Sequence, residues 1–214
     1  MFAVDATLVL ILLTAAISIY AWSNPEFQDS WILNPFVMRK RNEWYRFLTA
    51  GFLHADLMHL IFNMFAFYSF GVIIQAVFER FFGPQDGLLC YLVLYLGGII
   101  VSDIPSYIRH RKDVDYRSLG ASGGVAAVIF ASILFNPVAP KGSGIYVFPI
   151  PFPIQPFLFG LLYLGYSYYQ GRRQGGNINH DAHFYGALYG MLVTLIMFPE
   201  AGSIFLSQVK QYLF

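Results

Sequence analysis

Six apolar stretches, each close to the length of a bilayer crossing, constrain this chain more than any other feature of its sequence. A membrane-spanning helix needs about 20 apolar residues to cross roughly 30 Å of hydrocarbon. The six stretches cover residues 2–22, 52–78, 88–108, 120–135, 147–169 and 183–206. Only 12% of the residues are charged, whereas soluble domains contain about 25%. The sequence therefore predicts an all-α, polytopic membrane protein, in which residues 1–214 form a single domain of six transmembrane helices.

Charge and cysteine content narrow the functional classes further. The formal net charge is +1, which gives no indication of a nucleic-acid partner. The single cysteine, Cys90, lies within an apolar stretch, so no disulfide framework is possible within the chain. The first apolar stretch follows Met1 without a basic region, and we expect a retained helix rather than a cleaved signal. Residues 26–45 mix aromatic and basic side chains, which indicates a segment at the membrane interface.

A serine set among glycines, Ser122 in the run GASGG, begins the fourth apolar stretch. Ser122, His183 and Asn63 each lie 15 or 16 residues before the proline or charged residue that follows their own stretch. Every second stretch crosses in the same direction, and an α-helix rises 1.5 Å per residue, so all three residues lie ~23 Å from the same face. The spacing therefore predicts that the three side chains share one level inside the membrane.

Side chains of these types are suited to acyl transfer. A serine hydroxyl becomes a nucleophile when a base takes its proton, and an imidazole is the side chain best suited to that work near neutrality. Attack on a carbonyl creates an oxyanion, which needs hydrogen-bond donors. Asn63 offers an amide donor, and His59 lies four residues earlier on the same helix face. The backbone N–H of Ser122 lies at a helix N-terminus, where donors lack helical partners.

Other polar and small residues have simpler interpretations. Gly186 and Gly190 form a small-residue seam after His183, which is common in membrane packing and could bring the histidine's helix against the serine's. A lone serine in a membrane helix is usually bonded to its own helix. His54 lies near the start of its helix, where polar groups are less costly, and we interpret it as structural. His180 and His183 lack an acidic partner set, so no metal site is predicted.

Three separated motifs together carry a family resemblance. Residues 44–64 begin with WYRFLT and contain a His-x-x-x-Asn element at His59 and Asn63. The sequence GASG surrounds Ser122, and AHFYGALYG contains His183. In this order the motifs resemble those of the rhomboid family of intramembrane serine proteases. The resemblance covers nearly the whole chain and implies the six-helix rhomboid bundle without an extra helix.

The resemblance implies an intramembrane serine endopeptidase that cleaves transmembrane segments of other membrane proteins with a Ser-His dyad. Ser122 would be the nucleophile and His183 the general base. His59 and Asn63, with the Ser122 N–H, would form the oxyanion hole. No metal or organic cofactor is implied, and the expected partners are transmembrane protein substrates and the lipid bilayer. The segment between the first two helices would be the family's membrane-embedded loop, and the fifth helix with the loop after it would gate lateral substrate entry.

Two features depart from the family pattern. The family often has an aromatic residue four positions after the nucleophile, against which the base packs, and here that position is Ala126. Another aromatic residue, such as Phe184 or Tyr185, would then support the ring of His183. The usual family orientation puts the amino terminus in the cytoplasm, yet most basic residues would then lie outside, which is the reverse of the positive-inside rule.

Two other functions fit parts of the sequence. The first alternative is a non-proteolytic rhomboid-like membrane protein that binds client membrane proteins, although such a protein has no need of Ser122 and His183. The second is a small-molecule transporter, which would suit polar residues at depth, but transporters often show internal repeats and broken helices that are not evident here. We expect a multi-pass integral protein, of a bacterial inner membrane.

Overall fold

The computed structural model describes residues 5–147, 149–173 and 178–214, and this part of the chain is almost entirely helical. Its only β-pairing in those ranges is two isolated bridges, Leu33 with Ser118 and Ile145 with Ile154. The elements in chain order are α1 (Ala6–Ser23), α2 (Pro25–Trp31), α3 (Pro35–Arg41), α4 (Arg46–Thr49), the 3-10 helix η1 (Ala50–Phe52), α5 (Leu57–Phe82), α6 (Pro84–His110), α7 (Ser122–Phe135), α8 (Pro156–Arg173), α9 (His180–Met197) and α10 (Glu200–Leu213).

Three of the described helices, α1, α5 and α6, are long and apolar enough to cross a membrane. The bent pair α9 and α10 would add a fourth crossing if counted as one broken span, whereas α7 is a shorter apolar helix. The chain is therefore an all-helical membrane protein with three to four candidate spans. Each of the six predicted stretches contains a helix, but the count of six crossings stays a prediction.

Two predicted helix boundaries are wrong. The fifth stretch was expected to be helical from residue 147, but α8 begins at Pro156, because the proline-rich segment before it pairs Ile145 with Ile154 instead. The sixth was expected to continue to residue 206, but α9 ends at Met197 and α10 leaves it at 111°. Pro199 lies at this break, where a proline cannot continue the preceding helix.

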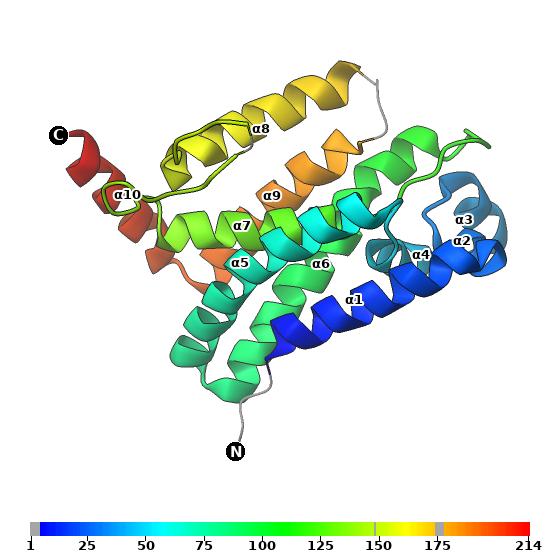
Figure 1. Cartoon of the computed structure of the whole chain (residues 1–214), viewed down its shortest axis with the longest axis horizontal. Coiled ribbons are helices and arrows are strands. Elements are labelled where there is room, and N and C mark those ends of the chain that lie inside the picture. The colour runs from blue at the N-terminus through cyan, green and yellow to red at the C-terminus, as the bar shows by residue number, and fades with distance from the viewer. Residues whose placement is uncertain (1–4, 148, 174–177) are drawn as a thin grey trace.

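Helix α7 forms the centre of the bundle. All of its residues from Gly123 to Phe135 are buried. The helices α5, α6 and α9 surround it, while α1 and α8 lie on opposite sides of the molecule (Figure 1). An apolar helix that is buried all round belongs to the core of a membrane bundle, so the residue at its start has a fixed environment.

Glycines allow α9 to lie directly on the backbone of α7. A Cβ on Gly186 would collide with the carbonyl of Gly123, and a Cβ on Gly190 would collide with the carbonyl of Ala127. Helix α6 also approaches α7 closely, because a Cβ on Gly98 would lie 2.8 Å from the Ala127 Cβ atom and 3.0 Å from the Gly124 Cα atom. Small residues at crossing points let helices pack closely in membranes. The seam expected from the glycine spacing is confirmed.

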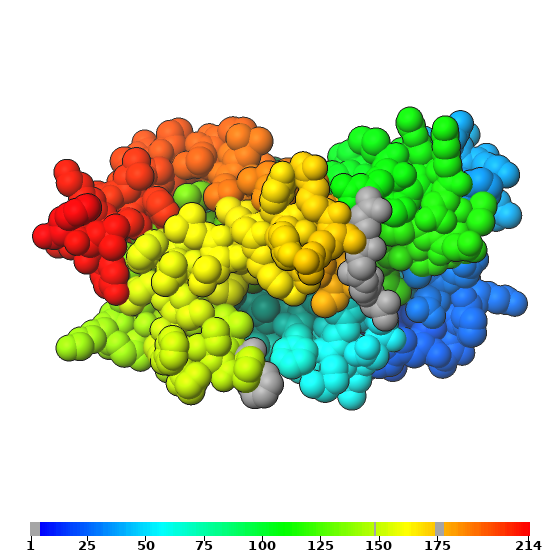
Figure 2. Space-filling model, turned by 90° about the horizontal axis from the view of Figure 1, so that it is seen from above, coloured from blue at the N-terminus to red at the C-terminus, as the bar shows by residue number. Residues whose placement is uncertain are grey.

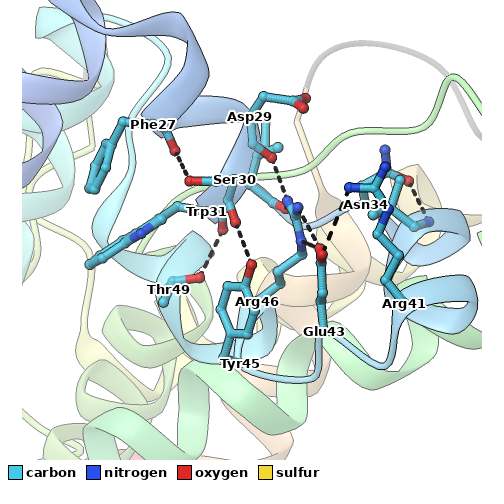
Figure 3. Close-up of polar contacts among 12 residues, drawn as sticks. Phe27, Asp29, Ser30, Trp31, Asn34, Arg41, Glu43, Tyr45, Arg46 and Thr49 are labelled. Atoms are coloured by element: carbon cyan, nitrogen blue, oxygen red, sulfur yellow. Dashed lines mark hydrogen bonds and ion pairs between the residues drawn. The ribbon is translucent and has the colours of Figure 1, made fainter.

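A single arginine holds together the segment between α1 and α5. The guanidinium of Arg46 donates to the carbonyls of Asp29 and Ile32 and pairs with Glu43 at 2.7 Å (Figure 3). Its side chain is only 4% exposed. The Thr49 hydroxyl adds a bond to the carbonyl of Trp31. Arg46 therefore links α4 to the carboxyl end of α2, and the segment is an ordered layer rather than a loose loop.

Candidate active site

Ser122 is the first residue of α7, and the backbone leading to it is held on both sides. Ser118 exchanges two backbone hydrogen bonds with Leu33, at 3.0 and 3.1 Å. Gly120 donates its N–H to the carbonyl of Ala50 at 3.0 Å. Gly120 has a φ of 129°, a conformation that favours glycine. The half-buried Ser122 therefore begins its helix from a fixed turn.

His59 lies against this turn. Asp56 caps α5 by accepting the His59 N–H at 2.8 Å. The Nδ1 atom of His59 accepts the N–H of Ala55 at 3.3 Å, so the ring proton lies on Nε2. A Cβ on Gly120 would be 3.1 Å from that Nε2 atom. The donor nitrogen of His59 thus lies next to the backbone two residues before Ser122.

Asn63 lies one turn further along α5, and its side chain is 9% exposed. Its Nδ2 atom donates to the carbonyl of His59 at 3.0 Å. An asparagine amide carries two hydrogens. The second has no protein partner within the part of the chain that the structure describes, so it is free to bind a ligand oxygen.

His183 lies in the first turn of α9, three residues before the close contact of Gly186 with Gly123. Its ring stacks on Tyr163 of α8, with centroids 6.0 Å apart and planes 24° from parallel. No hydrogen bond joins His183 to Ser122 among the described residues. The structure therefore brings the two helix starts together but leaves the two side chains unbonded to each other.

An aromatic residue outside α7 supports His183, as expected, but it is neither of the two residues named as examples. Phe184 packs against Tyr168 instead, and Tyr185 is 38% exposed. Tyr163 contacts the histidine ring and is itself packed against Phe130 of α7. This contact was not identified from the sequence. The sequence signal for this contact was the small residue at position 126, because it leaves His183 without an aromatic neighbour from α7 and an aromatic ring from another helix must then pack there.

Tyr163 reaches His183 from a helix at the outside of the bundle. Figure 2 shows α8 as a ridge over one face, with part of α5 visible in a recess beside it. Helix α8 packs mainly on α9 and only slightly on α7. The ring that supports His183 therefore belongs to the least enclosed of the helices near the site.

His54 lies outside the helix that carries His59. It was expected near the start of that helix, but α5 begins only at Leu57, so His54 lies in the segment before it. Its buried ring contacts that of His59 edge-on at 4.9 Å, and Ser18 of α1 lies 3.0 Å from its Nδ1 atom. Trp22 of α1 donates to the His54 carbonyl at 2.7 Å. His54 thus connects α1 to the ring of His59, in line with a structural role.

No three side chains of the metal-binding types gather into a group in the described ranges. His180 and His183 face each other edge-on at 5.8 Å, and His180 also contacts Tyr166. The neighbourhood of Ser122 is thus one of hydroxyl, imidazole and amide groups. This set can transfer protons and stabilise an oxyanion without a metal.

Comparison with known proteins places the chain among rhomboids. The Rhomboid domain family model matches residues 41–200. RHOMBOID-like protein 12, mitochondrial, of Arabidopsis thaliana is 27% identical over 181 residues, covering 75% of this chain and 50% of that protein. Rhomboid-like protein 11, chloroplastic, of the same plant is 30% identical over 187 residues, covering 82% of this chain and 61% of the relative.

A bacterial relative is also found. Rhomboid protease GluP of Bacillus subtilis (strain 168) is 28% identical over 164 residues, covering 76% of this chain and 28% of that protein. The chain spans about half of the first plant relative and 61% of the second, so the relatives include regions without a counterpart here. With three-quarters of its length inside the family model, the chain belongs to the rhomboid family.

Proposed function

We propose that this protein is an intramembrane serine endopeptidase that cleaves transmembrane segments of other membrane proteins. One observation carries the proposal: the glycine contact between α9 and α7 joins a point three residues after His183 to a point one residue after Ser122. The donor nitrogen of His59 lies against the same turn. A nucleophile, a base and an oxyanion donor from three separate helices are thus close together. The similarity to a bacterial rhomboid protease adds support.

In the proposed mechanism, His183 takes the proton of the Ser122 hydroxyl as its oxygen attacks the scissile carbonyl. The negative charge on the resulting oxyanion is stabilised by the Nε2–H of His59, the second amide hydrogen of Asn63 and the backbone N–H of Ser122. His183 then gives that proton to the leaving amine as the peptide C–N bond breaks, and the tetrahedral intermediate collapses to an ester of Ser122. Water, deprotonated by the same imidazole, hydrolyses the ester and restores both side chains. None of these steps needs a cofactor.

The bond between Ser122 and His183 would form when substrate is bound, because hydrogen bonds of catalytic groups are often long in the free enzyme. We propose that substrate reaches the site from the side of α8, the helix least enclosed by the bundle. Its movement would admit a transmembrane segment from the lipid. The bacterial inner membrane stays a prediction, since the relatives carry mitochondrial and chloroplastic names as well as a bacterial one.

The second candidate is a rhomboid-like protein that binds client membrane proteins without cleaving them. The observation that favours it is the absence of a Ser122–His183 hydrogen bond in the described ranges. The two functions differ in one chemical property: a protease must have a serine that reacts with acylating or phosphonylating reagents, whereas a client-binding protein does not need one.

Labelling with a serine-reactive fluorophosphonate tests the choice directly. Purified wild-type protein should be labelled and should cleave a model transmembrane substrate in detergent or liposomes. Ser122→Ala and His183→Ala should each abolish both signals, because the hydroxyl needs its base. Ser132→Ala is the matched control, since it removes another buried hydroxyl from α7, and it should keep both signals. Unlabelled, inactive wild-type protein that still binds membrane proteins would favour the client-binding function.

A further inference from the structure

A partly buried polar cluster links α6, the approach to α7 and the start of α9. Its members are Asp103 and Ser106 on α6, Ser118 in the segment before α7, and Asn179 immediately before α9. Asp103 is only 7% exposed. Ionisable side chains inside a membrane are costly and usually indicate function. The proposed mechanism uses none of these four residues, so the cluster needs a separate explanation.

Asn179 is the centre of the cluster. Its Nδ2 atom lies 3.1 Å from the hydroxyl oxygens of Ser106 and Ser118 and 3.4 Å from a carboxylate oxygen of Asp103. Its Oδ1 atom accepts the N–H of Ala182 at 3.0 Å, which caps α9, and also lies 3.2 Å from the Ser106 hydroxyl. One amide therefore faces three different segments of the chain.

Two of those segments lead directly to the proposed catalytic residues. Ser118 lies four residues before Ser122, and Asn179 lies four residues before His183. The approach to Ser122 is held from the other side by the backbone pairing of Ser118 with Leu33. Asn179 is thus the side chain that joins the approach to the nucleophile with the approach to the base.

We propose that Asn179, oriented by the Asp103 carboxylate, is a positioning residue that fixes the separation of Ser122 from His183 by binding Ser118 while capping α9. This inference rests on the proposed function for its kinetic consequence. The Asp103 oxygen accepts from the amide nitrogen and thereby directs the amide oxygen toward the first turn of α9. Replacement of the amide nitrogen by a second carboxylate oxygen leaves α9 capped but sets that oxygen against the Asp103 carboxylate, which pushes the side chain away from its place beside Ser118.

A simple helix cap would not require this arrangement. Asn34 caps α3 with its Oδ1 atom, which accepts the N–H of Val37 at 3.2 Å. Its side chain is 2% exposed, and its amide nitrogen has no hydrogen-bond partner in the described part of the chain. Aspartate caps a helix as well as asparagine does. Exchange of asparagine for aspartate therefore removes the two amide N–H donors but keeps the oxygen that caps the helix. The substitution thus separates the positioning role from the capping role.

The test compares Asn179→Asp with the matched control Asn34→Asp, both in full-length protein at equal folded fraction. Cleavage of a transmembrane substrate and the rate of fluorophosphonate labelling are measured. Asn179→Asp should lower kcat and the labelling rate by roughly ten- to a hundredfold with little change in KM, because a misplacement of about 1 Å can cost ~10²-fold. Asn34→Asp should leave both rates at the wild-type value.

A rescue experiment distinguishes positioning from general damage. Asp103→Asn alone should also lower kcat, since Asn179 loses the acceptor that orients its amide. The double variant D103N/N179D places the amide and the carboxylate in the opposite order, so one donor–acceptor pair is restored and much of kcat should return. A double variant no more active than either single variant would overturn the proposal, as would an Asn179→Asp protein with wild-type kcat.

The two proposals fail in different ways. If the wild-type protein neither cleaves substrate nor reacts with the fluorophosphonate, the protease function fails. The positioning role of Asn179 is then tested by measuring the distance between the starts of α7 and α9. Spin labels at Arg117 and Tyr185, on a background of Cys90→Ser, report the separation of the two helix starts. Asn179→Asp should broaden the distribution of that distance and increase its mean. An unchanged distribution would overturn the positioning role whether or not the protein is a protease.

Discussion

The contact of Gly186 with α7 gives the sharpest quantitative expectation. In Gly186→Ala, the new methyl carbon would lie 2.8 Å from the Gly123 Cα atom and closer still to the Gly123 carbonyl. Carbon atoms in contact prefer ~3.5–4.0 Å, so α9 must move away from α7 by about 1 Å. Backbone atoms on the other side of the contact cannot rotate away, as a side chain could. The substitution therefore separates the two helix starts.

This displacement has two measurable consequences. Overpacking of a tight contact costs about 1–3 kcal/mol of stability. A shift of about 1 Å between reacting groups can lower turnover by ~10²-fold. Since Gly186 lies three residues after His183 in α9, the imidazole should move with the helix. We therefore expect Gly186→Ala to lose much more activity than its modest loss of stability explains.

The assay is kcat for a transmembrane substrate, at a temperature where both proteins are fully folded. Gly165→Ala on α8 is the matched control, because a Cβ at Gly165 meets nothing within 4 Å. It should retain wild-type turnover and melting temperature. Wild-type turnover by Gly186→Ala would refute the reasoning, since the distance between the two helices would then not govern the chemistry.

Other predictions concern the histidines and the arginine before α5. Cleavage should decrease on acidification as His183 takes up a proton, and a pH-independent rate at constant folded fraction would contradict its role as base. Burial lowers the pKa of His54, in the loop before α5, to about 3. The unfolded chain then binds the extra proton first, so stability should decrease as pH falls from about 6.5 toward 3, with a smaller decrease in His54→Gln. His59→Ala should lower kcat by ~10²–10³-fold as an oxyanion donor is lost, whereas His54→Ala should mainly lower the melting temperature. Arg46→Ala should cost about 3 kcal/mol, because its buried partners lose their donor. Arg41→Ala, from an exposed pair, should cost under ~1 kcal/mol in the same thermal unfolding experiment.

Much of the helix arrangement could be predicted because hydropathy and glycine spacing are local signals. The seam at Gly186 and Gly190 predicted the contact of α9 with α7, since small residues at a four-residue spacing lie on one helix face. The start of α8 at Pro156 could not be read from hydropathy, because the preceding segment is as apolar as a helix but pairs as a bridge. The bend near Pro199 was available in the sequence, although the predicted crossing was continued past it to residue 206.

The neighbours of the proposed site were harder to predict. Tyr163 and His183 lie on different helices, and nothing in the local sequence of either indicates the other. Asn179 has the sequence pattern of a helix cap, which is all that its position before α9 reveals. Its bonds to Asp103 and Ser118 depend on how α6 packs against two other segments. Such contacts are set by tertiary structure, so a single sequence carries no signal for them.

The stacking of Tyr163 on His183 has a consequence for inhibition. The proposed base, His183, is stacked on a ring of α8, while the proposed nucleophile, Ser122, begins the buried helix α7. A small molecule inserted between α8 and α9 would remove that support without touching the Ser122 hydroxyl. Such a compound would act as a reversible, non-covalent inhibitor and would slow fluorophosphonate labelling without competing for the serine. The replacement of an aromatic residue on α7 by one on α8 thus gives the proposed base a support that lies away from the proposed nucleophile.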